Sequence, residues 1–211
     1  MAESLAIHPN EKPAPASKER AIVEAAARVF LAQGYGAASM DAIADEAGVS
    51  KQTVYSHFGA KDALFGAIVE GKCNELLDSF SLPSVPGQHP REALSDLAKR
   101  FLDTVLASPS MALFRVVIAE SSRFPELAEI FYRTGPAVAL ANLSAYLKDL
   151  DEDGALKVAD ANSSAKLFFA MLRGDLYFRR LLGLIPEPSA EEIEAAVEEV
   201  ITAFLVSHAP S

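Results

Sequence analysis

The 211-residue chain has little cysteine, no long apolar run and no clustered histidines. Its single cysteine, Cys73, excludes a disulfide within the chain and favours a reducing compartment. Because no apolar stretch of about 18 residues and no signal-peptide pattern is present, we expect a cytoplasmic protein that does not enter a membrane. His8, His57, His89 and His208 are scattered, and none has metal-ligand spacing with another or with Cys73.

The signatures of an enzyme are missing as well. The sequence has no glycine-rich phosphate loop, no serine nucleophile elbow and no zinc-binding helix. No paired acids, and no nucleophile with a base, stand in a pattern that would build a catalytic site. We therefore expect no enzymatic activity, no cofactor and no bound metal. We interpret Cys73 as a buried structural thiol, because no second cysteine could resolve an oxidised form within the chain.

The chain does contain a helix-turn-helix pattern, over residues 39–62. An apolar set recurs at helical spacing before Gly48, a residue that adopts the left-handed turn conformation at no steric cost. Ser50 is a good N-cap for a second helix that runs to Phe58. Two short helices joined by a turn of about three residues form the motif whose second helix enters a DNA major groove. The apolar set of the first helix is Met40, Ile43, Ala44 and Ala47.

The second helix of this pattern presents hydrogen-bond donors for DNA. Once Val54 and Phe58 are assigned to the core, the residues expected to face outward are Lys51, Gln52, Thr53, Tyr55, Ser56 and His57. Each of them can donate to a phosphate or to a base edge. Lys51 and Lys61 also stand in first helical turns, where the helix dipole disfavours a cation unless an anion such as phosphate docks nearby. Ordinary solvated lysines are the alternative.

Basic charge is scarce in this chain, which constrains how it can bind DNA. Against 19 lysines and arginines stand 29 acidic residues, and the net charge is −10. A DNA-binding surface must therefore be local, on the segment 51–61, and we expect Asp41, Asp45 and Glu46 to point elsewhere. Such a surface predicts weak non-specific affinity and a steep dependence on sequence and salt. The alternative that the negative charge favours is a helix-turn-helix that binds protein.

Residues 18–70 resemble the DNA-binding domain of TetR/AcrR-family transcriptional regulators. The matching residues, in order, are Ala25-Ala26, Phe30, Gly34-Tyr35, Ser39-Met40, Ile43-Ala44, Ala47-Gly48-Val49-Ser50, Tyr55, His57-Phe58 and Lys61-Asp62. The resemblance implies phosphate contacts from Ser39, Tyr55, His57 and Lys61. It implies base contacts from Lys51, Gln52, Thr53 and Ser56. The chain departs from the family at Ala38, where threonine is frequent, and at Ala60, where a serine or asparagine cap is usual.

Beyond residue 70 every periodic segment is helical, which predicts an all-α protein. Prolines and glycines separate the expected helices, at 61–80, 90–107, 110–121, 125–134, 137–150, 161–182 and 189–207. The expected domains are a flexible N-terminal arm (1–16), a helix-turn-helix domain (17–62) and an effector-binding and dimerisation domain (63–211). We favour a solvated arm over one that reaches a minor groove with Lys12, Lys18 and Arg20.

The helix expected at 189–207 carries an apolar stripe flanked by glutamates. Packed against the apolar 161–182 helix, it would build a four-helix dimer seam across a two-fold axis. A dimer also suits the motif, because two recognition helices must lie about 34–36 Å apart to read a two-fold operator. The alternative is a helix that packs only on its own core. The residues predicted for the seam are Leu172, Leu176, Ile193, Val197, Val200, Ile201 and Phe204.

Residues 113–187 also resemble the AefR-like subgroup of TetR C-terminal domains. Such domains usually bind a small effector among their helices, and a change in helix spacing releases DNA. The resemblance thus implies a homodimeric, ligand-responsive regulator, more often a repressor, that leaves its operator when the effector binds. We expect an apolar or aromatic effector, or one with an anionic group that faces Arg115. The residues predicted to line the site are Phe101, Met111, Phe114, Ile118, Tyr146 and Phe169, with Arg115, Asn142 and Arg173 as polar anchors.

Two further interpretations stay open. Asp149, Asp151 and Asp153, followed by Gly154 and a final Asp160, copy most of a calcium-loop pattern, although glutamate normally supplies the last two oxygens. We favour an acidic helix end that Gly154 terminates over a calcium-modulated regulator. The second interpretation is a helical small-molecule sensor or adaptor that does not bind DNA, which the intact 51–61 surface disfavours.

Overall fold

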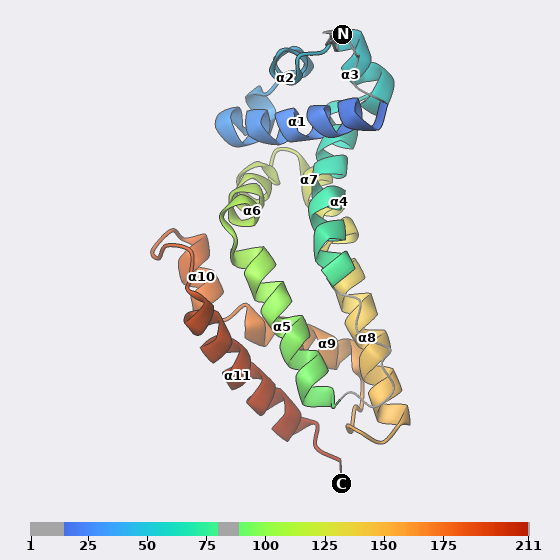
Figure 1. Ribbon diagram of the computed structural model, residues 1–211, viewed down its shortest axis with the longest axis vertical. Coiled ribbons are helices and arrows are strands. Elements are labelled where there is room, and N and C mark those ends of the chain that lie inside the picture. Colours follow the sequence, from blue (N-terminus) through green and yellow to red (C-terminus); the bar gives the residue numbers. More distant parts are fainter. Residues whose placement is uncertain (1–14, 80–88, 211) are drawn as a thin grey trace, which may run out of the picture. The chain divides into compact units, whose positions relative to one another are not determined.

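The computed structural model describes residues 15–79 and 89–210, and the side chains of residues 18–71 and 89–210. The described residues form helices and no strand, so the predicted all-α class is confirmed (Figure 1). The chain divides into two compact units, an N-terminal unit that ends at Ile68 and a C-terminal unit that begins at Val69. The predicted arm lies almost wholly outside the described residues, and so does the side chain of Cys73.

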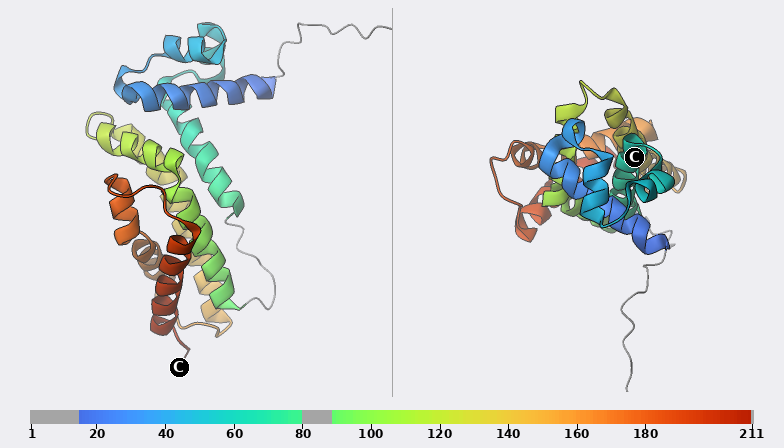
Figure 2. Two further views of the ribbon diagram at one scale, coloured as in Figure 1. Left: turned by 60° about the vertical axis from the view of Figure 1, so that its left-hand side comes forward. Right: turned by 90° about the horizontal axis from the view of Figure 1, so that it is seen from above.

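The N-terminal unit consists of α1 (Pro15–Ala37), α2 (Met40–Ala47), α3 (Lys51–Phe58) and the first turns of α4 (Lys61–Ser79). In this unit α1 packs on α2, and α2 packs on α3 (Figure 2). The predicted domain boundary at residue 62 falls inside α4, as does the observed division. Because α1 already begins at Pro15, Lys18 and Arg20 belong to a helix and not to an arm.

Three aromatic rings fix the start of α4 against α1. The rings of Phe30, Tyr35 and Phe65 lie 5.3 to 6.0 Å apart, centre to centre. All three side chains are buried, and aromatic pairs at this separation stabilise a core beyond the area that they bury. Gly34, beside Tyr35, has the non-helical values φ 77° and ψ 158°, so it interrupts α1 at this point.

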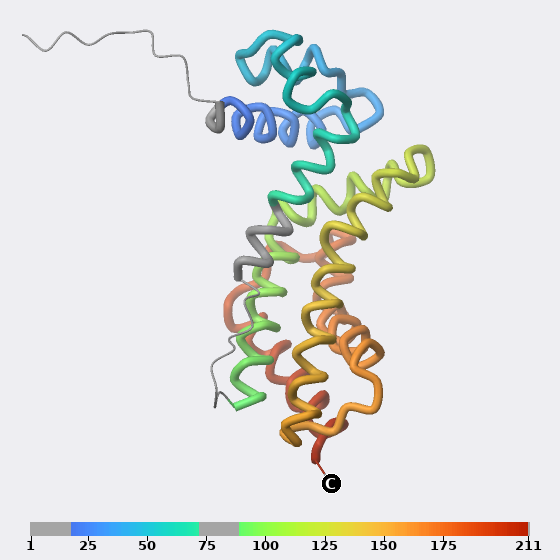
Figure 3. The backbone as a smooth tube through the Cα atoms, turned by 90° about the vertical axis from the view of Figure 1, so that its right-hand side faces the viewer, coloured from blue at the N-terminus to red at the C-terminus, as the bar shows by residue number. Residues whose placement is uncertain are grey.

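The C-terminal unit contains the remainder of α4 and seven labelled helices after it. These are α5 (Pro90–Leu106), α6 (Ser108–Glu120), α7 (Pro125–Thr134), α8 (Pro136–Glu152), α9 (Ala161–Leu172), α10 (Asp175–Leu181) and α11 (Ala190–Ser207). Within this unit α5 packs on α11 and α8 packs on α9 (Figure 3). Over the described ranges, only α5 and α6 taken together, with a 66° bend between them, match a membrane span in length and composition; no single helix does.

The single helix predicted over 161–182 is in fact two helices, which corrects the sequence interpretation. Arg173 and Gly174 separate α9 from α10, and Gly174 has a non-helical ψ of −149°. A Cβ atom added at Gly174 would lie 3.2 Å from the carbonyl oxygen of Met171, so a larger residue would crowd this break. The apolar pattern continues across the break, and for that reason periodicity alone could not detect it.

The core of the C-terminal unit contains the residues that were predicted to form a dimer seam. Six of them are buried in the single chain, and Leu176 is partly buried against the same core: the six are Leu172, Ile193, Val197, Val200, Ile201 and Phe204. The stripe on α11 therefore packs on its own chain, which was the alternative interpretation. A side chain that is already buried in the core offers no surface to a second subunit, so the seam prediction does not fit this burial.

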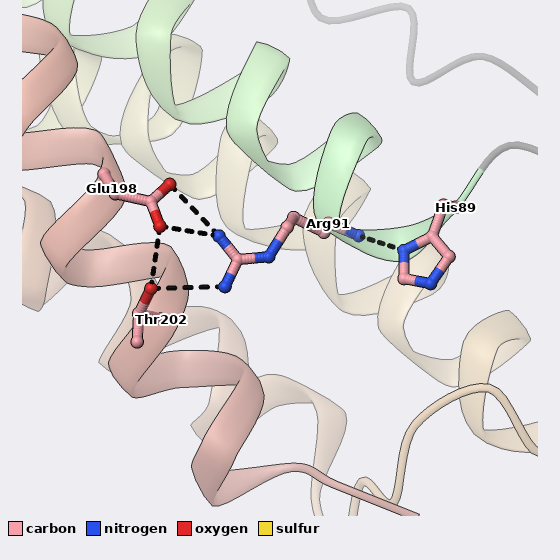
Figure 4. Close-up of polar contacts among 4 residues, drawn as sticks. All are labelled: His89, Arg91, Glu198 and Thr202. Atoms are coloured by element: carbon pink, nitrogen blue, oxygen red, sulfur yellow. Dashed lines mark hydrogen bonds and ion pairs between the residues drawn. The ribbon is translucent and has the colours of Figure 1, made fainter.

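A polar contact joins the start of α5 to α11 (Figure 4). Arg91 donates from Nη1 to both carboxylate oxygens of Glu198, at 2.8 and 3.1 Å, and from Nη2 to Thr202, at 3.2 Å. Hydrogen bonds from Thr202 and Arg91 lower the pKa of the Glu198 carboxyl. Because these side chains are exposed, the contact aligns two helices that the core already holds and adds little stability of its own.

The acidic residues between Asp149 and Asp160 make contacts at the end of α8 and the start of α9. Asp151 accepts the backbone N–H of Val158 at 2.8 Å, and Asp160 caps α9 by accepting the backbone N–H groups of Asn162 at 3.0 Å and Ser163 at 3.2 Å. Gly154 has a left-handed φ of 71°, and Leu156 after it is buried. Within the described side chains, no group of three or more histidine, cysteine or acidic residues could hold a metal ion. The geometry thus supports the acidic helix end and gives no support to the calcium interpretation.

Candidate DNA interface and effector cavity

The turn between α2 and α3 depends on two residues that the sequence pattern singled out. Gly48 has the left-handed values φ 65° and ψ 31°, and it ends α2. A side chain would be strained in that conformation, since it brings Cβ close to the following carbonyl oxygen. Ser50 begins α3, because its hydroxyl oxygen accepts the backbone N–H of Thr53 at 3.1 Å. Both predicted roles are confirmed.

One face of α3 is exposed and carries the predicted hydrogen-bond donors. Val54 is fully buried and Phe58 is partly buried, so these two orient the helix. The opposite side, which we call the α3 face, consists of the exposed residues Lys51, Gln52, Tyr55, Ser56 and His57. Tyr55 keeps 44% of its surface exposed, so its ring and hydroxyl are accessible from solvent.

The hydrogen-bond donors of α3 differ in whether they already have a partner within the protein. Thr53 is partly buried, and its hydroxyl lies 2.8 Å from the Ser50 hydroxyl. Ser56 donates its hydroxyl to the Thr53 carbonyl at 2.8 Å. By contrast, the side chains of Gln52, Tyr55 and His57 make no hydrogen bond with any described residue. These three polar side chains can therefore bind DNA without first breaking an internal hydrogen bond.

Lys51 is paired inside the protein, contrary to the expectation that nearby acids point away. Its Nζ lies 2.8 Å from a carboxylate oxygen of Asp41, so the prediction for Asp41 is wrong. The hydrogen bond and the charge of Asp41 raise the pKa of Lys51. Glu46 does point elsewhere, to Arg28 at 2.7 Å. Asp41 thereby compensates a cation at the unfavourable end of α3, the task that the sequence argument assigned to phosphate.

Lys61 also has partners inside the N-terminal unit. Its Nζ donates to the carbonyl oxygens of Tyr35 at 2.7 Å and Ala38 at 2.9 Å, and lies 4.4 Å from the centre of the Tyr35 ring. These carbonyls belong to the end of α1, where the helix dipole is negative and attracts a cation. Lys61 therefore ties the first turn of α4 to the end of α1, and its predicted contact with phosphate stays a prediction.

Ser39 occupies the start of α2 and is exposed. Its hydroxyl oxygen accepts the backbone N–H of Ala42 at 3.1 Å, so Ser39 is the N-cap of this helix. A serine hydroxyl that accepts one bond still has a proton to donate. The predicted phosphate contact is therefore chemically compatible with the capping role.

The C-terminal unit contains a cavity of about 660 Å³, which we call the C-terminal cavity. Its wall comes from α5, α6, α7, the start of α8, the α9–α10 break and α10, with Val69 at one edge. Five of its lining residues are aromatic, among a larger number of aliphatic ones: Phe101, Phe114, Phe131, Tyr132 and Tyr177. The volume is within the range of about 300–1,000 Å³ that is typical of small-molecule sites.

The rings of the C-terminal cavity come from separate helices and lie near one another. The ring centres of Phe114 and Phe131 are 5.3 Å apart and nearly parallel, with 29° between the planes. Tyr177 lies 6.2 Å from Phe114. Burial raises the pKa of the Tyr177 hydroxyl to about 12, so it stays protonated and can donate a hydrogen bond at neutral pH. The guanidinium of Arg173 lies 5.8 Å from the centre of the Phe101 ring.

The sequence matches two family models in the same order as the two units. Residues 22–68 match the model of bacterial regulatory proteins of the tetR family. Residues 92–210, more than half of the chain, match the C-terminal domain of AefR-like transcriptional repressors. The chain belongs to the TetR family.

Relatives with solved structures include other TetR-family regulators. The flavonoid-responsive regulator FrrA is 35% identical, with a TM-score of 0.79, over 92% of this chain and 98% of FrrA. A TetR-family regulator from Mesorhizobium loti is 29% identical, with a TM-score of 0.82, over 93% of this chain and 99% of its own. An HTH-type transcriptional repressor from Mycobacterium tuberculosis is 29% identical over 89% of each chain. DNA-binding regulation of transcription is thus the family's function.

Within this TetR-family chain, four of the predicted effector contacts line the C-terminal cavity: Phe101, Phe114, Ile118 and Arg173. The other five do not line it: Met111, Arg115, Asn142, Tyr146 and Phe169. Met111 and Phe169 are buried in the core, and Tyr146 packs against it. Asn142 is exposed on α8. Arg115 donates to the carbonyls of Leu181 at 2.9 Å and Arg180 at 2.7 Å, so it holds the end of α10.

Sequence reasoning missed three of the aromatic residues in the cavity wall, namely Phe131, Tyr132 and Tyr177. Tyr177 falls within the single helix predicted over 161–182, but the break at Gly174 starts a new helix, α10, from which this ring lines the cavity. Phe131 and Tyr132 belong to α7, whose sequence predicts a helix but does not identify its neighbours. Aromatic residues on four separate helices were the available signal, and only the fold brings them together.

Proposed function

We propose that this TetR-family regulator binds a two-fold operator as a homodimer, represses transcription and leaves the operator when a small effector enters the C-terminal cavity. The observation that carries the DNA-binding part is the α3 face, with free donors at Gln52 and His57 and an orientation set by Val54. On this proposal the regulator acts on DNA in the bacterial cytoplasm. Repression, and not activation, is supported by two similarities. The C-terminal family model is described as that of transcriptional repressors, and the M. tuberculosis relative is named a repressor.

The roles at the DNA follow from the chemistry of each side chain. We assign phosphate contacts to Ser39, Tyr55, His57 and, secondarily, Lys61, whose ammonium already has carbonyl partners. We assign base contacts to Lys51, Gln52, Thr53 and Ser56. Gln52 is the strongest candidate for sequence reading, because a free amide can bond an adenine edge with two hydrogen bonds. To contact a base, Lys51 would have to leave its ion pair with Asp41.

The dimer contact is assigned to apolar side chains that the single chain leaves exposed. Large apolar residues of α9, α10, the following turn and α11 are 46% to 74% exposed: Leu167, Phe178, Leu182, Leu184 and Val206. Such residues replace the buried α11 stripe as the candidate interface, since exposed apolar area favours association. A Phe178→Glu chain should be monomeric by light scattering, whereas the Tyr132→Glu control, with 56% of Tyr132 exposed on α7, should stay dimeric.

Effector release is assigned to α4, the helix that carries both Lys61 and Val69. Val69 borders the C-terminal cavity, while Lys61 is bonded to the end of α1. A ligand that displaces Val69 acts on the same continuous helix whose first residue positions α1 and α2. The FrrA relative is described as flavonoid-responsive, which supports an aromatic effector here.

The experiment that tests this function selects binding sites from a random duplex library with the purified chain. We expect a two-fold symmetric site, with log affinity that falls linearly against log salt. Tyr55→Ala should weaken binding to all sequences, and Gln52→Ala should change the sequence preference. If a well-folded dimer enriches no site, the chain is a sensor or adaptor without DNA binding, and the proposal is overturned.

A further inference from the structure

We propose that the effector is a flat aromatic monoanion, held between the rings of the C-terminal cavity with its negative charge at Arg173. The proposal deepens the function proposed above by naming the chemical class of the ligand. It depends on three observations: the charge of the lining residues, the partners of the nearby arginines and the arrangement of the rings.

The lining of the C-terminal cavity favours an apolar ligand with one negative charge. Among the described residues that form it, Arg173 alone is charged, and no carboxylate is present. A cationic ligand would lose its hydration and find no acid in exchange, which costs several kcal/mol or more. Hydroxyls of Thr104, Ser110 and Ser121 provide a few polar contacts, too few for a sugar or another ligand that is polar throughout.

Arg173 differs from Arg115 and Arg180 because its side chain has no hydrogen-bond partner among the described residues. Arg115 donates to two carbonyls at the end of α10, and the buried Arg180 donates to the Ser108 hydroxyl at 2.8 Å. The side chain of Arg173, in contrast, makes no hydrogen bond or ion pair with the described residues; its guanidinium lies near the Phe101 ring, and its charge acts on the Tyr177 hydroxyl. It sits at the exposed α9–α10 break, where a planar guanidinium can bind a carboxylate with two hydrogen bonds.

The rings favour a flat ligand over a flexible acyl chain. Phe114 and Phe131 stack on each other, and Tyr177 and Phe101 approach from α10 and α5. Aromatic rings gain free energy from stacked or edge contacts with another ring beyond what area alone supplies. The protonated Tyr177 hydroxyl can donate to an oxygen on the ligand. A two- or three-ring molecule with a carboxylate or an acidic phenol satisfies all of these features.

Isothermal titration of the full chain tests the class with three probes: biphenyl-4-carboxylate, its carboxamide and dodecanoate. We expect the carboxylate to bind about tenfold more tightly than the carboxamide, the factor that one charge-assisted pair supplies. Biphenyl-4-carboxylate should also bind more tightly than dodecanoate. Equal affinity for the carboxylate and the carboxamide would overturn the anionic part, and tighter binding of dodecanoate would overturn the aromatic part.

Variants separate each contact from a general loss of structure. Arg173→Gln should abolish the tenfold preference for the carboxylate and leave the carboxamide affinity unchanged. The control Arg133→Gln removes an exposed arginine of α7 that does not line the cavity, and should leave the preference intact. Phe114→Leu should weaken both biphenyl probes more than dodecanoate. An unchanged preference in Arg173→Gln would show that another group holds the charge.

Titration in the absence of DNA also separates this inference from the proposed function. If the chain enriches a symmetric operator but binds none of the probes at millimolar concentration, the ligand class is wrong and the DNA-binding function stands. If biphenyl-4-carboxylate binds as expected but no operator is enriched, the ligand class stands and the DNA-binding function fails.

Discussion

The helix ends of the two units are specified in different ways. In the N-terminal unit, Ser39 and Ser50 cap α2 and α3 with their own side chains, and Gly48 ends α2. In the C-terminal unit, α6, α7, α8 and α10 begin without a side-chain cap of their own. The N-terminal unit is therefore encoded by residues close in sequence, whereas much of the C-terminal unit depends on tertiary contacts.

The start of α6 illustrates how a distant residue replaces a local cap. The carboxylate of Glu187, 79 positions away, accepts from the backbone N–H of Ser108 at 2.9 Å and from its hydroxyl at 2.6 Å. Arg180 donates to the same hydroxyl at 2.8 Å. The first turn of α6 is thus stabilised by the segment after α10, and its local sequence contains no sign of this.

The largest effect is expected in the core of the C-terminal unit, on which its helix ends depend. Phe168 of α9 is fully buried, with ring centres 5.8 Å from Phe169 and 5.1 Å from Phe204. Phe168→Ala should lower the free energy of unfolding by about 3–5 kcal/mol, as measured by urea denaturation. The exposed control Lys166→Ala on the same helix should change it by less than about 0.5 kcal/mol. A loss below about 1 kcal/mol for Phe168→Ala would mean that local signals suffice in this unit too.

The next effect concerns Lys61, which ties the first turn of α4 to the end of α1 within the N-terminal unit. Lys61→Met removes its bonds to the Tyr35 and Ala38 carbonyls, so we expect a loss of about 1.5–3 kcal/mol in the free energy of unfolding. The slope of log affinity for the operator against log salt should fall by less than one, because Lys61 is only a secondary phosphate contact. The control Lys51→Met, on the α3 face, should change the sequence preference and barely change stability. An unchanged stability of Lys61→Met with a slope reduced by a full unit would make the phosphate its main partner.

The sequence predicted the helix-turn-helix well because its determinants are local. Gly48, Ser50 and Val54 stand within seven positions of one another, and the structure gives each its expected role. The partners of Lys51 and Lys61 could not be predicted in this way. Asp41 becomes a neighbour of Lys51 only after α3 has packed on α2, and Tyr35 becomes a neighbour of Lys61 only after α4 has packed on α1.

The C-terminal unit was predicted less completely, for the corresponding physical reason. An apolar stripe shows which face of a helix is buried but not what covers it, so Ile201 and Phe204 were assigned to a partner when their own core covers them. The apolar periodicity also continues across the break at Gly174, so the sequence predicted one helix where there are two. From the sequence alone, either Arg115 or Arg173 could have bound the charged group of an effector. Only the fold shows that Arg115 already donates to carbonyl oxygens of the protein.

A smaller effect is expected where a local cap is removed. Ser50→Ala removes the oxygen that accepts the Thr53 N–H, and should lower the free energy of unfolding by about 1 kcal/mol. Ser144→Ala, in the interior of α8, is the matched control, and should be neutral or slightly stabilising because alanine is the better helix former. Urea denaturation of both variants measures the difference. Equal effects would contradict the view that α3 depends on its own cap.

The smallest effect should reveal the distant cap of α6 through its pH dependence. Hydrogen bonds from Ser108, first from its hydroxyl and then from its N–H, lower the pKa of Glu187 below its ordinary value of 4.5. Since the folded pKa lies below the unfolded one, the stabilisation is present above about pH 4.5 and is lost as the pH falls through the folded pKa. The wild type should therefore have a larger free energy of unfolding than Glu187→Gln at pH 7. In urea denaturation this difference, or gap, between the two proteins should shrink as the pH is lowered. Glu194→Gln, an exposed change on α11, should produce no gap at either pH. A gap for Glu187→Gln that is the same at both pH values would mean that the charge of this carboxylate does not hold α6.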